Sequence, residues 1–267
     1  MWFKVRSCMF IGLALMIPSL TGVLDAEPES NVSFECSTRP NTTLNEPIVV
    51  KMKVRNGLKE NINVDLGLDR KSQLTLKIVE PNGISTKPLQ FSPHGLATSG
   101  KFSIGPEETY SHEILLDEWY RPAQLGTYKV EVSLAKPLLT DNGMKIDAKI
   151  AGEVTFRVGP RDEKVLKDRC RQLVDKVLHG QSDGERSEAA LTLSYVVDPV
   201  AVPYLGNILK DGGDMGYFAV DGLVRIRNAQ AVETLRSYLN AANPELKLRI
   251  EGGLFEIKTG IPVRVED

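Results

Sequence analysis

The chain has 267 residues, of which 42% are hydrophobic, and this is enough for two cores of ordinary domain size. Its formal net charge is −2, and the charges are balanced: residues 27–160 carry 16 Lys and Arg against 17 Asp and Glu, and residues 161–267 carry 15 against 17. Neither half has the basic excess that neutralises a phosphate backbone, so nucleic acid is not an expected partner.

The first 26 residues have the order of a secretory signal peptide. Lys4 and Arg6 give a positive start, an apolar run from Met9 to Leu24 follows, and Ala26 is the expected cleavage point. The alternative is an uncleaved membrane anchor, for which this proline-containing run is short. No cysteine stands directly after the run to carry a lipid. We therefore expect a periplasmic or secreted protein with no membrane contact after cleavage.

Residues 27–160 show the period-two alternation of half-buried strands, with apolar residues on one face and mostly charged residues on the other. Turn signals at Asn82-Gly83 and Asn142-Gly143 separate the strands. This pattern predicts an antiparallel β-sandwich of the immunoglobulin-like kind. The expected strands cover residues 48–56, 62–68, 74–78, 102–104, 110–116, 127–134 and 145–158, the last broken near Gly152.

A tyrosine supports the sandwich. Tyr128 follows a turn at Gly126 and enters a late strand, where its hydroxyl can bond back across a corner and pin the fold.

A resemblance concerns the same part of the chain. Its residues are Val54-Arg55-Asn56, Gly105-Pro106-Glu107-Glu108, Trp119 and Gly126-Thr127-Tyr128. Their order resembles a bacterial sandwich domain similar to an intracellular subtilisin inhibitor. The resemblance implies the sandwich, and no distinct inhibitory loop accompanies it.

Beyond residue 160 the apolar period changes to 3.6, and a stripe over residues 165–178 predicts a helix that Gly180 closes. An internal repeat follows, in which Leu191, Leu223 and Leu254 hold equivalent positions 32 and 31 residues apart. Each unit has the pattern helix, turn, helix, with an apolar face too narrow to fold alone. The units must therefore stack, and the segments 203–210 and 231–240 are expected to form the concave face.

The residues that carry the repeat are Asp198-Pro199-Val200-Ala201-Val202-Pro203-Tyr204-Leu205 and Gly222-Leu223-Val224-Arg225-Ile226. This pattern resembles the bacterial HEAT-like repeats first noticed in phycobilisome lyases, over roughly residues 185–260. The resemblance implies a short α-solenoid used for protein contact. It brings no lyase activity, because the matching residues are packing and turn residues. The fold class is therefore multidomain: a signal peptide (1–26), a sandwich (27–160) and helical repeats (161–267).

The sequence contains few candidates for chemistry. His94, His112 and His179 lie far apart and in no metal-ligand spacing, and no nucleophile elbow, phosphate loop or dinucleotide fingerprint occurs. The glycine-rich stretch 211–216 favours a helix-end turn, with a calcium loop as the alternative. We expect no cofactor, no metal and no enzyme activity.

Two other groups have two interpretations each. Cys36 and Cys170 are expected to be buried thiols, with a disulfide between them as the alternative. Asp117-Glu118 is interpreted as a solvated strand end, since neighbours on a strand point to opposite faces and an acid–base pair would need a bulge.

The binding candidate is the cluster Trp119, Tyr120 and Arg121, because these residue types are enriched at binding hot spots and loops beyond strands often carry them. The alternative is that Trp119 packs into the core of the sandwich.

The function that these patterns favour is an exported, non-catalytic protein-binding or scaffolding module. Two alternatives stay open: a protease inhibitor or enzyme regulator acting through a loop of the sandwich, and a hydrolase with an unrecognised site. The partner is expected to be a protein, and the oligomeric state is open. The repeat array has no clear polar cap after Ile257, so a partner or a second copy is expected to cover its last face.

Overall fold

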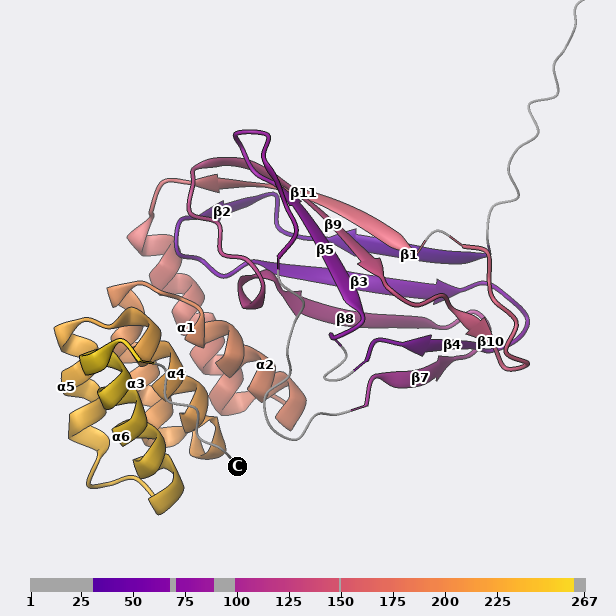
Figure 1. The fold of residues 1–267 in the computed structure, drawn as a ribbon. Helices are drawn as coiled ribbons and strands as arrows, with labels where there is room; N and C mark the ends of the chain where they lie inside the picture. Colours follow the sequence, from indigo (N-terminus) through magenta and orange to yellow (C-terminus); the bar gives the residue numbers. More distant parts are fainter. Residues whose placement is uncertain (1–30, 68–70, 89–98, 149, 262–267) are drawn as a thin grey trace, which may run out of the picture.

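A computed structural model describes residues 31–67, 71–88, 99–148 and 150–261. The expected signal peptide and His94 lie outside these residues. The strands of the described chain precede all of its α-helices (Figure 1). The strands are β1 (Val32–Ser37), β2 (Asn41–Thr43), β3 (Val49–Asn56), β4 (Ile62–Asp65), β5 (Leu74–Val79), β6 (Ser85–Thr86), β7 (Lys101–Ile104), β8 (Thr109–Leu115), β9 (Gly126–Leu134), β10 (Leu139–Thr140) and β11 (Ala151–Gly159).

The strands form a β-sandwich. One sheet has the order β2-β11-β9-β5-β6, and the other layer consists of the sheets β1-β3-β8 and β10-β4-β7. Neighbouring strands run antiparallel, except for β2, which pairs with β11 in parallel through the register Val158↔Thr42. This parallel pairing brings the end of β11 next to β2, so that Gly159 lies opposite Thr43.

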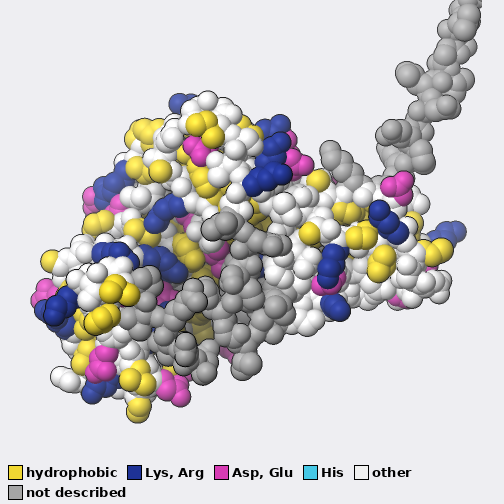
Figure 2. All heavy atoms as spheres, viewed as in Figure 1, with side chains coloured by type: hydrophobic (Ala, Val, Ile, Leu, Met, Phe, Trp, Pro, Cys, Tyr) yellow, Lys and Arg dark blue, Asp and Glu magenta, His cyan; other side chains and the backbone are white. Residues whose placement is uncertain are grey.

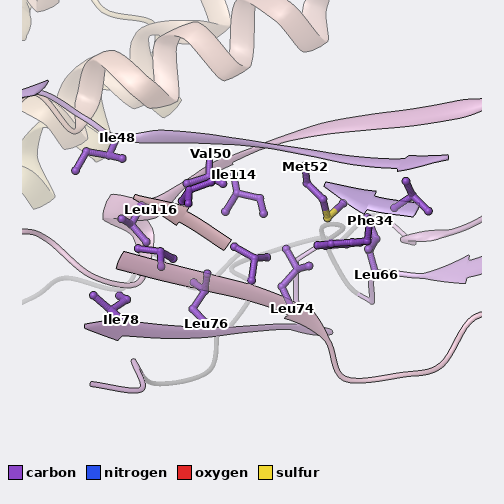
Figure 3. Close-up of a cluster of buried hydrophobic side chains, with 14 of the residues drawn as sticks. Phe34, Ile48, Val50, Met52, Leu66, Leu74, Leu76, Ile78, Ile114 and Leu116 are labelled. Atoms are coloured by element: carbon purple, nitrogen blue, oxygen red, sulfur yellow. The ribbon is translucent and has the colours of Figure 1, made fainter. Parts of the chain in front are cut away.

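The core lies between the two layers, as the alternation predicts. Val50 and Met52 of β3 are fully buried and point toward Leu76 and Ile78 of β5, and Ile114 of β8 lies beside them (Figure 3). Complete burial of such a side chain contributes roughly 1.5–3 kcal/mol. The expected strands at 48–56, 74–78, 102–104, 110–116 and 127–134 all occur, with ends shifted by a residue or two.

Two polar side chains fix the corners of the sandwich. The Tyr128 hydroxyl donates to the Gln124 carbonyl at 3.0 Å and accepts from the Gln124 amide at 3.1 Å, so the predicted tyrosine corner is confirmed. The fully buried amide of Asn56 donates to the carbonyls of Glu60 at 2.8 Å and of Ile104 and Gly105 at 3.0 Å. One side chain therefore holds the two turns that lead from β3 to β4 and from β7 to β8.

The strand expected over residues 145–158 begins only at Ala151, and the break expected near Gly152 does not occur within it. Residues Ala151–Gly159 form one strand that passes through Gly152 without interruption. A Cβ atom at this position would lie 2.8 Å from the Sγ atom of Cys36 on β1. The glycine is thus explained by the close approach of two strands, which is the other common reason for glycine in a strand.

The helices form three antiparallel pairs that stack in two layers, with α1, α3 and α5 in one layer and α2, α4 and α6 in the other (Figure 1). Leu191, Leu223 and Leu254 lie on α2, α4 and α6, as the repeat spacing predicts. No helix among the described residues is both long and apolar enough to span a bilayer. The helices are α1 (Glu163–His179), α2 (Asp183–Ser194), α3 (Val202–Asp211), α4 (Gly216–Ile226), α5 (Ala229–Tyr238) and α6 (Pro244–Thr259).

Candidate functional site at the junction of strands and helices

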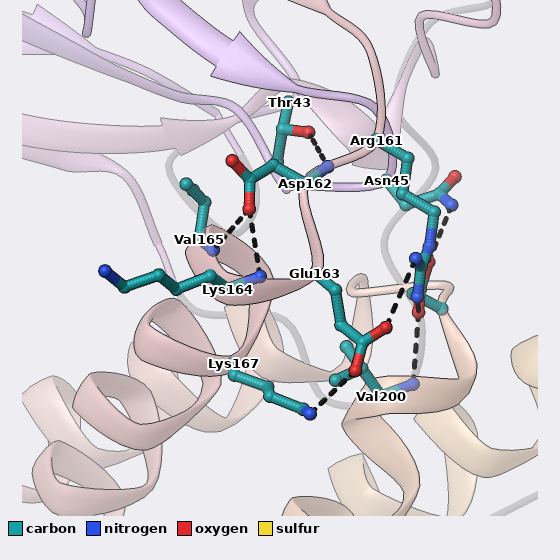
Figure 4. Close-up of polar contacts among 10 residues, drawn as sticks. Thr43, Asn45, Arg161, Asp162, Glu163, Lys164, Val165, Lys167 and Val200 are labelled. Carbon is teal, nitrogen blue, oxygen red and sulfur yellow. Dashed lines mark hydrogen bonds and ion pairs between the residues drawn. The ribbon is translucent and has the colours of Figure 1, made fainter.

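Asp198 is the centre of the junction between the sandwich and the helices. It lies at the N-cap of the 3-10 turn η3 (Pro199–Ala201), where aspartate followed by proline is a favoured start, and it accepts from the Val200 amide at 3.1 Å. Its carboxylate also accepts from Arg161 Nε at 2.7 Å and Nη2 at 2.9 Å, and from Asn45 Nδ2 at 3.0 Å. Arg161 and Asn45 converge on it from the β-sandwich side (Figure 4).

The charge of Asp198 is stabilised in place. Only 1% of the residue is exposed, and this burial alone would raise its pKa. Hydrogen bonds from Arg161, the Val200 amide and Asn45 outweigh the burial, and the pKa of Asp198 is lowered. A buried carboxylate with donors from both parts of the chain is a strong positional constraint, because each donor that moves away costs a hydrogen bond to a buried charge.

The segment between β11 and α1 is held by Thr43 of β2. The Thr43 hydroxyl donates to the Pro160 carbonyl at 2.6 Å and accepts from the Asp162 amide at 2.7 Å (Figure 4). Asp162 is itself the N-cap of α1 and accepts from the amides of Lys164 and Val165. The helices therefore start in a direction that the edge of the sandwich sets.

The structure does not bring the predicted binding cluster to one surface. Trp119 packs against the sandwich core, and the ring of Tyr120 lies 6.3 Å from that of Tyr128. Arg121 points the other way, and its Nη2 atom donates to the Tyr195 carbonyl at 3.1 Å, between η3 and the end of α2. The packing alternative thus describes the surroundings of Trp119, while Arg121 belongs to the junction.

A second arginine, Arg225 of α4, also contacts Tyr195. The guanidinium carbon of Arg225 lies 4.0 Å from the centre of the Tyr195 ring, and Arg225 Nη1 donates to the Ser194 hydroxyl at 2.9 Å. A cation over an aromatic face contributes about 0.5–2 kcal/mol, more when water is excluded. The contacts of Arg121 and Arg225 connect the loop after β8 to the second helix pair through Tyr195.

The interpretation of Asp117 and Glu118 as a solvated strand end is wrong. Both belong to a 3-10 turn, η2 (Leu116–Glu118). The Glu118 side chain is 8% exposed and pairs with Lys71 at 2.6 Å, and Asp117 Oδ2 accepts from the Ile48 amide at 2.8 Å. Burial raises the pKa of Asp117 to about 7. In the sequence these two acids stand between two predicted strands, and nothing there indicates that the 3-10 turn η2 buries their side chains.

A cleft of about 430 Å³ lies between the sandwich and α2. Its walls come from both parts of the chain, so neither part forms it alone. The sandwich contributes Val49, Lys71, His112, Glu113 and Leu115, and α2 contributes Gly184, Ser187, Glu188, Leu191 and Thr192.

The other candidates behave as ordinary structural residues. His112 lies on the inner side of β8 and His179 in the last turn of α1. Cys36 and Cys170 are free thiols, and burial raises their pKa values to about 11 and about 12. Residues 211–216 form the end of α3 and a 3-10 turn, η4 (Gly213–Met215). Across the described residues, no three or more His, Cys, Asp or Glu side chains gather as a metal site would need.

No family model matches the chain, and no curated protein matches it in sequence. Solved structures do match in part. The CARDB domain of a Pyrococcus furiosus protein, in complex with di-metal ions, is 13% identical over 48% of this chain and 87% of that one, with a TM-score of 0.27. A mutant β-glucosidase from Listeria innocua in complex with laminaribiose is 12% identical over 49% of this chain and 16% of that one, at 0.28.

A third match is a Pseudomonas fluorescens alkylpurine DNA glycosylase bound to DNA with an abasic site analog, 14% identical over 49% of this chain and 31% of that one, at 0.24. The prediction that the chain is not an enzyme does not stand: it rested on absent motifs alone, and the chains that match in part include a glucosidase and a glycosylase. Such partial similarity assigns neither activity to this protein.

Proposed function

We propose that the protein is an exported protein-binding or scaffolding module, active in the periplasm or outside the cell after removal of residues 1–26. In this proposal residues 27–160 are an immunoglobulin-like domain and residues 161–267 a short HEAT-like solenoid. The two domains present one composite surface to a protein partner.

The observation that supports this proposal is the cleft shared by the sandwich and α2. Apolar walls such as Leu115 and Leu191 lie beside the charged groups of Glu113 and Glu188, a mixture of apolar and polar groups that suits a protein surface. The Asp198–Arg161 pair and the Thr43 bonds keep the two walls at a fixed spacing. A binding surface built in advance in this way loses less entropy on association than one formed by two loosely tethered domains.

Affinity capture with cross-linking from the envelope fraction of the source organism tests the proposal. Leu191→Glu places a charge on the cleft wall, and Ile84→Glu places the same charge on the exposed turn after β5. We expect the first variant to retain about one tenth or less of the partner cross-linked to the wild type, and the second to retain all of it. Equal recovery by both variants would refute the cleft as the binding surface.

A further inference from the structure

The last helix pair leaves an outer face uncovered. α5 and α6 pack against α3 and α4 on one side, and no other described helix lies on the opposite side (Figure 1). Leu248 and Phe255, seven residues apart and hence on one face of α6, are 63% and 50% exposed, and Ile261 is 60% exposed. Hydrophobic side chains gather beside Lys and Arg over this end of the molecule in Figure 2.

In the preceding helix pair, the positions equivalent to these exposed ones are buried by the next pair. Val224 on α4 holds the place of Phe255 on α6, 31 residues earlier, and it is 8% exposed because α6 covers it. Gly206 on α3 is buried, and a Cβ there would lie 3.4 Å from Thr234 of α5. The corresponding position in the last pair, counted from the caps Asp198 and Asn228, is the exposed Arg236.

A groove of about 380 Å³ runs between α5 and α6 on this face. Its floor is apolar and consists of Val232, Leu254, Phe255 and Ile257, and two cations, Arg236 and Lys258, also line it. Within residues 31–67, 71–88, 99–148 and 150–261, neither cation forms an ion pair.

Two arginines near the groove are paired with carboxylates. Arg227 binds Glu256 at 2.8 Å, and Arg249 binds Asp221 at 2.6 Å. Arg236 and Lys258 line the groove itself without such a carboxylate, and they complement an acidic occupant.

We propose that this groove binds an acidic amphipathic helix of a partner protein, whose apolar side chains fill the floor and whose carboxylates pair with Arg236 and Lys258. A helix fits because helices fill the equivalent groove of the preceding pair. A second copy of this chain does not fit, since a symmetric contact would bring like charges of the two grooves together. This surface is separate from the cleft, so the inference goes beyond the proposed function and does not depend on it.

Two fluorescein-labelled peptides of about 16 residues test the proposal, a length that gives roughly four helical turns. Both carry leucines at positions i, i+3, i+4 and i+7, and the flanking positions are glutamate in one peptide and lysine in the other. Fluorescence anisotropy measures their binding to the full chain. We expect the acidic peptide to bind at least ~10-fold more tightly, and the difference to shrink at high salt.

Substitutions test whether the acidic peptide binds in the groove between α5 and α6. The double substitution Arg236→Glu and Lys258→Glu should reverse the preference in favour of the lysine peptide. The control Lys53→Glu and Lys77→Glu makes the same change of net charge on exposed strand positions and should leave the preference unchanged. Phe255→Ala should weaken the acidic peptide ~10-fold or more. Leu191→Glu, at the cleft, should have no effect.

Several results would overturn the proposal: no binding of either peptide, equal binding of both, or a preference that the Arg236 and Lys258 substitutions leave unchanged. Sedimentation that reveals a dimer broken by Phe255→Ala would identify a second copy as the occupant instead. A chain ending at Ile261 that binds the acidic peptide tenfold more tightly than the full chain would identify the protein's own C-terminal residues as the occupant.

Discussion

Arg161 donates hydrogen bonds to both carboxylate oxygens of Asp198, from Nε to Oδ2 at 2.7 Å and from Nη2 to Oδ1 at 2.9 Å. The two residues belong to different parts of the fold. Arg161 follows the last strand of the sandwich, and Asp198 caps the turn that begins the second helix pair. A bidentate guanidinium–carboxylate contact fixes orientation as well as distance. The pair therefore acts as a clamp between the strands and the helices.

Asp198→Ala should lower the free energy of unfolding by about 2–4 kcal/mol, because it removes a cap and leaves the Asn45 amide and Arg161 without their acceptor. The matched control is Asn228→Ala. Asn228 caps α5 in the equivalent turn through the Ala231 amide but forms no hydrogen bond to the described residues of the sandwich, and its loss should cost about 1 kcal/mol. Urea denaturation followed by circular dichroism measures both, and equal losses would contradict the clamp.

Asp117 should make the protein less stable as the pH rises. Well below pH 3.8, the ordinary pKa of the group, Asp117 is protonated in both the folded and the unfolded state. Between pH 4 and pH 7 the unfolded chain releases this proton, while burial, which raises the pKa of Asp117 to about 7, keeps it on the folded protein. The free energy of unfolding therefore falls by up to about 4 kcal/mol over this pH window because of Asp117, and this effect stays constant above pH 7.

Asp117→Asn isolates this effect, since the amide oxygen can still accept from the Ile48 amide while the proton release is lost. Arg121 and Glu118 face the same group and act in opposite directions on its pKa. We expect the variant to gain stability relative to the wild type from pH 4 to pH 8, measured by urea denaturation at each pH. A stability difference that does not change with pH would rule out the titration.

Trp119→Ala should unfold the sandwich more easily, by about 2–4 kcal/mol, because Trp119 packs against its core. Capture of a partner by the folded variant at low temperature should be unchanged. Loss of capture together with unchanged stability would show instead that Trp119 is a recognition residue.

Asn56→Ala should cost about 2–4 kcal/mol, since three carbonyls and the Leu58 amide lose a buried partner. Asn63→Ala is the control. Its side chain bonds to the Thr140 carbonyl and to Asp141 near the surface, and its loss should cost less than about 1 kcal/mol. Thermal unfolding of the two variants compares a buried corner with an exposed one.

Local patterns predicted the elements well. Alternation placed β3, β5 and β8 because one face of each strand is buried, and this constraint acts on consecutive residues. The tyrosine corner followed from Tyr128 and a glycine turn. The leucine spacing placed α2, α4 and α6 in equivalent positions, since stacked units repeat their packing.

The junction could not be predicted, because its partners are far apart and chemically ordinary. Asn45 and Asp198 are separated by 153 residues, and each also has a local explanation as a turn residue or cap. Arg121 was predicted to be a binding residue because its actual partner, the Tyr195 carbonyl, lies 74 residues further along the chain and leaves no local signal. Asp117 was misplaced because strand alternation does not apply to a 3-10 turn.

A fixed arrangement of the two parts is the central claim, and a distance measurement between spin labels tests it most directly. Ile84→Cys on the sandwich and Leu248→Cys on α6 offer exposed sites, with Cys8→Ser in the full chain. Cys36 and Cys170 should stay unlabelled, since burial raises both thiol pKa values far above neutral. Double electron–electron resonance should give one narrow distance distribution that Asp198→Ala broadens. A broad distribution in the protein with Asp198 intact would contradict the clamp and, with it, the composite surface.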